Sequence, residues 1–259
     1  MFKKISLLIA LLMLFVSGCG KVEKENDIYQ SIINRNKLIV GVVYDAKPFG
    51  FIDTDSELKG FDIDIAKELT KRMLGSDDKI EFKQVSSATR IQAITTGEVD
   101  LVIATMTITP QRKLIIDFSK PYYIAGQAIL VPESSDIKSV NDLNNKNVIV
   151  VLGTTGEKNL RYFAPGAVIQ GYKNYNSAFD ALKRDSADAL TTDDTIIRGF
   201  IMDNKGYKML PKKLTQEPYG IAFKNSEDAK ILKAKINRIL TDMKSDGTIR
   251  KIEKKWGVN

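Results

Sequence analysis

Short apolar runs of strand length alternate along this chain with segments in which apolar residues recur every three or four positions. The runs LIVGVV and VDLVIA are continuous, as in strands that are buried on both faces of a sheet. Between them, Phe61, Ile65 and Leu69 lie four residues apart, which predicts an amphipathic helix. The order β-α-β-α-β predicts a mainly parallel sheet covered by helices. It consists of strands at 38–43, 80–85 and 99–104 and helices at 61–73 and 89–96.

A second run of the same kind begins near Ile137. Tyr175, Ala178, Phe179 and Leu182 share one face of a predicted helix in it. The other predicted elements are strands at 147–152, 167–170 and 187–190 and helices at 157–163 and 193–203. A chain of 259 residues has room for two domains, so we expect an α/β fold with two lobes in tandem.

Two further strand-like runs lie at the borders of the second lobe. GQAILV at 126–131 stands between the two runs of elements, and YGIAF at 219–223 closes the second. Two extended crossings between lobes would form a hinge. We therefore expect one lobe from residues 36–127 and 221–259, and the other from 128–220, with hinge strands at both borders.

The amino terminus has the pattern of an export signal. Two lysines precede an apolar stretch at 5–16, which at about 1.5 Å per residue reaches about 18 Å, too short for a membrane span. Small residues then precede Cys19, the only cysteine. We expect residues 1–18 to be a signal peptide and 19–35 to be a lipid-anchored tether with a short helix. The alternative is an ordinary signal peptide with an incidental cysteine.

Composition narrows the chemistry. The chain has no histidine, which excludes Ser-His-Asp catalysis, His-liganded zinc and histidine-based pH switching. A single cysteine leaves no internal disulfide, and no metal-ligand cluster or cofactor motif stands out. The formal charge is +7, but the basic residues are interleaved with acidic residues along the chain, and no arginine-rich run occurs. We therefore expect no metal, no cofactor and no nucleic-acid partner.

Polar residues follow the strand predicted at 99–104. Ligands of open α/β sheets bind beyond the carboxyl ends of strands, and here that edge offers Thr105, Met106, Thr107 and, after a proline, Arg112. An arginine placed there can hold a carboxylate through two parallel hydrogen bonds. The alternative is a solvated surface arginine.

The second lobe offers matching groups. Thr154 and Thr155 lie between a strand and a helix, where backbone N–H groups suit an anion. Asp193 follows the strand predicted at 187–190; such an acid is most often a helix cap, but it could also hold an ammonium group. A cation on one lobe and an anion on the other together describe a site for a zwitterion.

The motifs KLIVGVVYDAKPFGF, GFDIDIAKEL, DLVIATMTITPQR, IDFSKPYY, TTDD and EPYGIAF, together with the segment before Cys19, resemble family 3 of the bacterial solute-binding proteins. These are the extracytoplasmic receptors of amino-acid ABC transporters. The resemblance implies a two-lobed periplasmic-binding-protein-like fold of type II, with the amino acid trapped between the lobes. It implies that Arg112 binds the ligand α-carboxylate and Asp193 the α-ammonium. Further contacts are implied for Thr105, Met106, Thr107, Thr154 and Thr155.

The same resemblance bears on ligand choice. Arg90 and Tyr219 match residues of members that bind acidic amino acids, but Val43 stands where those members often have a lysine, followed by Tyr44 as a further candidate contact. Glutamate, aspartate and glutamine all remain open.

The resemblance also implies a role and a place in the cell. We expect a monomeric transport protein that is exported and anchored to the extracytoplasmic face of the membrane by acyl chains such as palmitate on Cys19. Its expected partners are the permease subunits of an ABC transporter, to which it delivers the amino acid. The rival functions are a dehydratase-like enzyme on the same fold and an adhesin or sensor, and we expect no enzymatic activity.

Overall fold

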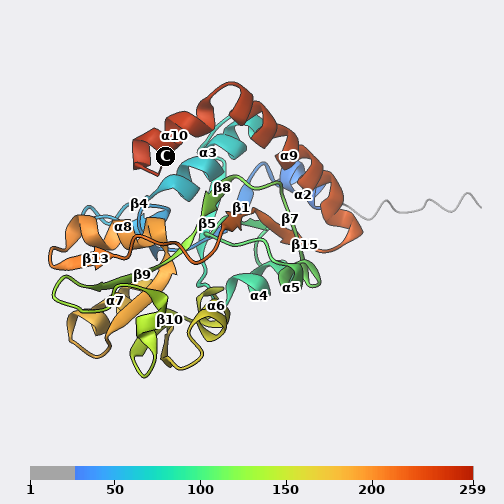
Figure 1. The fold of residues 1–259 in the computed structure, drawn as a ribbon. Coiled ribbons are helices and arrows are strands. Elements are labelled where there is room, and N and C mark those ends of the chain that lie inside the picture. The colour runs from blue at the N-terminus through green and yellow to red at the C-terminus, as the bar shows by residue number, and fades with distance from the viewer. Residues whose placement is uncertain (1–26, 259) are drawn as a thin grey trace, which may run out of the picture.

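The computed structural model describes residues 27–258, which form two α/β lobes with a five-stranded sheet each (Figure 1). The sheet of the first lobe has the order β5-β1-β6-β15-β7. β5, β1 and β6 run parallel, as the β-α-β-α-β pattern predicts, and β15 is antiparallel to both of its neighbours. Its strands are β1 (Leu38–Val42), β5 (Ile80–Gln84), β6 (Leu101–Val102), β7 (Ile116–Phe118) and β15 (Ala222–Lys224).

The longer helices cover the first sheet because they carry an apolar stripe. In α3, Phe61, Ile65 and Leu69 are fully buried, which confirms the four-residue spacing seen in the sequence. Figure 1 shows α3, α9 and α10 grouped on one side of this lobe. The helices are α2 (Ile28–Arg35), α3 (Phe61–Leu74), α4 (Arg90–Thr95), α5 (Pro110–Lys113), α9 (Lys230–Ser245) and α10 (Thr248–Trp256), with a short 3-10 turn η2 (Glu227–Ala229) before α9.

The second lobe repeats the design with the sheet order β11-β10-β12-β9-β13. β11, β10 and β12 are parallel, whereas β9 and β13 are antiparallel additions. Its strands are β9 (Gln127–Pro132), β10 (Asn147–Val151), β11 (Val168–Tyr172), β12 (Ala189–Asp193) and β13 (Tyr207–Met209). Its helices are α6 (Gly156–Phe163), α7 (Tyr175–Lys183) and α8 (Asp194–Asp203), with a 3-10 turn η1 (Val140–Leu143).

The chain crosses between the lobes on two antiparallel strands, β8 (Tyr123–Ala125) and β14 (Glu217–Tyr219), which form a two-stranded sheet of their own. These crossings lie a few residues before the runs expected at 126–131 and 219–223, which supply β9 of the second sheet and β15 of the first. The run YGIAF contains Gly220, at which the crossing strand ends and the chain turns into the first sheet. An apolar run alone does not reveal such a break.

A small sheet of β2 (Asp45–Ala46), β3 (Gly50–Ile52) and β4 (Leu58–Lys59) was not anticipated. The signal peptide and Cys19 lie outside the described residues, whereas the short helix expected after the tether is confirmed as α2. Within residues 27–258, no helix combines the length and the apolar character needed to cross a bilayer.

Candidate functional site

The site lies where the carboxyl ends of strands from both sheets face each other. Thr105 comes shortly after β6 of the first lobe, and Asp193 is the last residue of β12 in the second. Arg90, Thr105, Thr107 and Asp193 are all buried between the lobes, and Arg112 is half-buried beside them. The structure thus brings together the main charged residues that the sequence singled out.

A single peptide group at this edge is held from both sides. The guanidinium of Arg90 donates a hydrogen bond to the carbonyl oxygen of Ala104, while the N–H of Thr105 in the same peptide donates to Asp62 Oδ2 at 2.9 Å. Tyr122 donates its hydroxyl to the other oxygen of Asp62 at 2.9 Å. Thr105 has a φ of 45°, a left-handed conformation that a β-branched residue adopts only when its surroundings impose it.

The clamped peptide leaves hydrogen-bonding groups free in the interior. Thr105 Oγ1, Arg90 Nε and Ser87 Oγ are buried and have no hydrogen-bond partner among residues 27–258. Buried polar atoms are nearly always paired in folded proteins. Three orphans in one region therefore point to a polar ligand that completes them.

Two arginines meet at this place. Burial lowers the pKa of the Arg90 guanidinium, and nearby Tyr175, Tyr219 and Asp193 oppose that shift. Burial and the positive charge of Arg90 lower the pKa of Arg112 to about 10. Both groups remain charged at neutral pH, and their mutual repulsion makes the region attractive to an anion such as a carboxylate.

Both arginines also reach across to the second lobe. The carbonyl oxygen of Gly153 accepts hydrogen bonds from Arg112 Nη2 at 2.9 Å and from Arg90 Nη2 at 3.3 Å. Arg112 Nη1 donates to the carbonyl of Thr107 at 2.7 Å, so Arg112 is not the solvated surface arginine of the alternative reading. Gly153 has a φ of 81°, and a Cβ there would lie 2.4 Å from the carbonyl oxygen of Ser87. Only glycine permits this approach.

Asp193 supplies the opposite charge. It occupies the N-cap position of α8, but its side chain makes no capping hydrogen bond and instead accepts one from the hydroxyl of Tyr219. Burial raises its pKa to about 7, with repulsion from Glu217 and Asp194 acting in the same direction and the Tyr219 hydrogen bond and Arg90 opposing it. An ammonium group placed here would relieve this cost by pairing with the carboxylate.

The other candidates from the sequence either have their polar groups engaged within the protein or lie away from the residues around Arg90. Thr154 Oγ1 donates to Val151 O at 2.7 Å and Thr155 Oγ1 donates to Glu217 at 3.0 Å, so both hydroxyls are used within the second lobe. Met106 is fully buried and its carbonyl accepts the N–H of Gly220 at 3.0 Å. Tyr44 lines a groove of about 540 Å3 between the small sheet and α7–α8, whose lining includes none of the residues clustered around Arg90.

Two functional residues were missed by the sequence reasoning. Asp62 clamps Thr105, and buried Glu217 accepts hydrogen bonds from Thr155, Asn159 and Thr215. Both lie inside quoted motifs, GFDIDIAKEL and EPYGIAF, which is the signal that could have drawn attention to them. Within the part of the chain that the structure describes, no group of three or more acidic, histidine or cysteine side chains is arranged to hold a metal ion.

The lobes also touch at the mouth of the site. Asp45 Oδ2 accepts the N–H of Tyr175 at 2.6 Å, and Lys47 forms an ion pair with Asp203 at 2.7 Å. The backbone of Lys47 packs on α8 so closely that a Cβ at Gly199 would lie 2.3 Å from the Lys47 carbonyl oxygen. The structure therefore has its two lobes closed on each other.

Comparisons with known proteins agree with this architecture. Residues 38–259 match the model of the bacterial extracellular solute-binding proteins, family 3. The chain is 44% identical to the ABC transporter glutamine-binding protein GlnH of Bacillus subtilis over 93% of its own length and 88% of that protein. It is 45% identical to the glutamine-binding protein of Geobacillus stearothermophilus over 74% of each chain.

Solved structures give the same answer. An ancestral arginine-binding protein bound to glutamine superposes with a TM-score of 0.81 at 41% identity, covering 86% of this chain and 99% of that one. The two-lobed α/β fold that the motifs implied is therefore confirmed. The chain belongs to family 3 of the bacterial extracellular solute-binding proteins.

Proposed function

We propose that this protein captures a polar amino acid between its lobes, glutamine in preference to glutamate or aspartate, and delivers it to the permease of an ABC transporter. Two named glutamine-binding relatives at 44% and 45% identity support the ligand class. The observation that carries the proposal is the placement of Arg112 and Asp193 at one site from opposite lobes, Arg112 bonded to the carbonyl of Gly153 and Asp193 to the hydroxyl of Tyr219. In this proposal Arg112 holds the α-carboxylate and Asp193 the α-ammonium.

The preference for an amide follows from the state of Arg90. Its two terminal nitrogens already donate to carbonyl oxygens of Ala104 and Gly153, and Nε is its unpartnered nitrogen within residues 27–258. Arg90 is therefore partly engaged with backbone oxygens, whereas a side-chain carboxylate gains most from a cation that is free to give it two parallel hydrogen bonds. Val43 is buried and apolar where acidic-ligand binders often have a lysine. An acidic side chain would thus meet one cation fewer here than it does in those binders.

The remaining candidates extend the proposed contacts. Thr105 offers, from its clamped position, a hydroxyl that has no partner among residues 27–258, and Tyr219 orients Asp193 through their hydrogen bond. Thr154 and Thr155 contribute by shaping the loop before α6, since their hydroxyls are already engaged.

Calorimetric titration of the unfolded and refolded protein, freed of retained ligand, tests the assignment. We expect glutamine to bind more tightly than glutamate, aspartate, asparagine and arginine. Glutamate or aspartate as the tightest ligand would overturn the argument from Arg90 and Val43. Binding of a sugar or a peptide and of no amino acid would overturn the function itself.

We propose further that the protein only binds its ligand and catalyses no reaction. Asp193, with a pKa of about 7, is the group at the proposed ammonium position that could act as a general acid, and an ammonium paired to it removes that proton. The test is to incubate the protein with glutamine and with a cyclic aromatic precursor of the kind that dehydratases use. Recovery of both unchanged by mass spectrometry is expected, and a product that depends on Asp193 would refute the proposal.

As a member of an extracellular family, the protein acts outside the cytoplasm. We propose that acyl chains on Cys19 hold it to the membrane as a monomer. One acyl chain anchors a protein only marginally and two or more are needed for stable attachment. Cys19→Ser should therefore release it into the soluble fraction as a monomer in light scattering. A variant that stays as firmly membrane-bound as the parent would contradict the anchor, and a stable dimer would contradict the monomer.

A further inference from the structure

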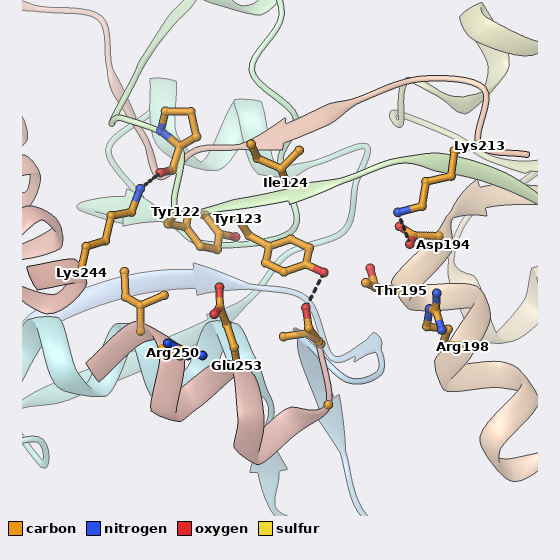
Figure 2. Close-up of a pocket in the computed structure, with 14 residues that line it drawn as sticks. Tyr122, Tyr123, Ile124, Asp194, Thr195, Arg198, Lys213, Lys244, Arg250 and Glu253 are labelled. Carbon is orange, nitrogen blue, oxygen red and sulfur yellow. Dashed lines mark hydrogen bonds and ion pairs between the residues drawn. The ribbon is translucent and has the colours of Figure 1, made fainter. Parts of the chain in front are cut away.

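A hollow of about 860 Å3 lies between α8 of the second lobe and α10 of the first, beside the crossing strand β8 (Figure 2). None of its lining residues is among those proposed to hold the amino acid. Consecutive residues serve the two places: Asp193 faces Tyr219 in the amino-acid site, whereas Asp194 lines the hollow. The hollow is therefore a separate space that adjoins the site through the start of α8.

The lining of the hollow is positively charged. It contains four basic side chains, Arg198, Lys213, Lys244 and Arg250, and two carboxylates, Asp194 and Glu253. Asp194 is already neutralised, because it pairs with Lys213 at 2.7 Å and accepts the N–H of Gly126 at 3.0 Å.

Among the described residues, three cations of the lining, Arg198, Arg250 and Lys244, form no ion pair, against one unpaired carboxylate, Glu253. Lys244 donates to the carbonyl of Pro121 at 2.7 Å. Arg198 and Arg250 are exposed and form no ion pair or side-chain hydrogen bond with any other residue of the described range 27–258. One projects from the second lobe and the other from the first.

A buried hydroxyl faces the same space. Thr195 is 4% exposed, and its Oγ1 has no hydrogen-bond partner among the described residues. Figure 2 shows this oxygen pointing away from α8 toward the gap beside Tyr123, between Asp194 and Arg198. Thr195 also lies in the first turn of α8, where the helix dipole favours negative charge. A buried polar atom left unpaired at the wall of a hollow indicates a ligand.

We propose that this hollow is a second ligand site, which takes a small organic or inorganic polyanion carrying carboxylate or phosphate groups. Arg198 binds it from the second lobe, Arg250 binds it from the first, and the Thr195 hydroxyl donates a hydrogen bond to it. Carboxylate and phosphate oxygens are the acceptors that guanidinium groups recognise best.

An anion held by both lobes is sensitive to the angle between them. Any change in that angle alters the separation of Arg198 and Arg250, which are fixed on α8 and α10. The hollow is lined as described when the lobes are closed, so the polyanion favours the closed arrangement. By thermodynamic linkage, the bound polyanion then increases the affinity for the amino acid, and the bound amino acid increases the affinity for the polyanion by the same factor. This coupling rests on the proposed amino-acid function, whereas the existence of the anion site does not.

Titration with pyrophosphate and with citrate, at constant ionic strength and first without amino acid, tests the site. We expect saturable binding of at least one probe. Its Kd should rise roughly tenfold or more in Arg198→Gln, which removes a charged donor, and in Thr195→Val, which removes a neutral one. Arg238→Gln is the matched control: it removes the same charge from an exposed position of α9 that does not line the hollow. Binding of pyrophosphate alone or of citrate alone supports the site and identifies its acceptor chemistry.

The result that overturns the proposal is equally definite. Failure of both probes to saturate, or equal weakening in Arg198→Gln and Arg238→Gln, would mean that the hollow only contributes to diffuse surface charge. In a second titration, the bound anion should lower the Kd for glutamine by a factor within the roughly 5- to 150-fold range of coupled sites. An unchanged Kd with the anion bound would refute the coupling while leaving the anion site in place.

Discussion

Ligand binding should release protons from Asp193. The empty site raises the pKa of this carboxyl group to about 7, mainly because it is buried. A ligand ammonium pairs only with the ionised form, so protonation competes with binding. For a pKa of about 7, the observed Kd should rise about twofold at pH 7, about 11-fold at pH 6 and about 100-fold at pH 5, relative to its value at high pH. Proton release should be about half a proton per ligand at pH 7 and about nine-tenths at pH 6.

Calorimetric titrations between pH 5 and pH 8, in two buffers of different ionisation enthalpy, measure both quantities. Asp193→Asn keeps an acceptor for Tyr219 but cannot ionise, so its weak binding should not release protons. Asp62→Asn should leave the release near pH 7 in place, because the pKa of Asp62 is raised only to about 6. A Kd that is constant from pH 5 to pH 8, or proton release that persists in Asp193→Asn, would refute the reasoning.

The raised pKa of Asp193 also predicts how the stability of the ligand-free protein depends on pH. The ordinary pKa of the Asp193 side chain is 3.8, so between about pH 4 and pH 7 the folded protein binds its proton more tightly than the unfolded chain does. This contribution to the free energy of unfolding is therefore most favourable at low pH and decreases as the pH rises toward 7. Denaturant titrations of the ligand-free protein and of Asp193→Asn measure the difference.

Three substitutions probe the rest of the site. Arg112→Ala should raise the Kd for glutamine by about 30-fold to several thousandfold. This corresponds to about 2–5 kcal/mol, the usual cost of removing one partner of a desolvated charge pair. Near-native affinity in a titration would exclude Arg112 from the site. Asp62→Ala leaves the Thr105 N–H buried and unpaired, so thermal unfolding should show a loss of about 1–3 kcal/mol that Asp62→Asn largely avoids; equal losses would contradict the role of the hydrogen bond. Gly153→Ala should raise the glutamine Kd at least about tenfold, because its Cβ would lie 2.4 Å from a carbonyl oxygen of the facing lobe. Gly97→Ala is its control, since Gly97 also has a positive φ (77°) but nothing within 4 Å, and similar effects of both substitutions on Kd would disprove the steric argument.

Regular elements could be predicted well where the periodicity is long. The continuous run around β1 and the four-residue spacing of α3 each extend over several residues, and both elements were found in place. β7 and β13 were missed because each has three residues and mixes polar with apolar side chains. The crossing strands were misplaced by a few residues because YGIAF, which looks like one strand, supplies the end of β14 and the start of β15.

The charged pair of the site could be predicted, but its supporting residues could not. Arg112 and Asp193 follow strands, and strand ends are where ligands gather in this class of sheet. Asp62 and Glu217 act through partners 43 and 62 residues away in the chain, Thr105 and Thr155, so no local pattern reveals them. The mixed use of Arg90, which holds a peptide group and reaches across the lobes, likewise depends on tertiary contacts.

The position of β15 has a consequence for the order of folding. This strand lies between β6 and β7 in the first sheet, and Ala222 pairs with Phe118 across about a hundred residues of chain. All strands of the second sheet come from the uninterrupted stretch between these two partners, so that sheet can assemble from neighbouring segments. The first sheet stays split, with two unprotected edges, until the second lobe has brought β15 back. A refolding experiment should therefore show the second lobe acquiring amide protection before the first, and aggregation should start from the open edges of β6 and β7.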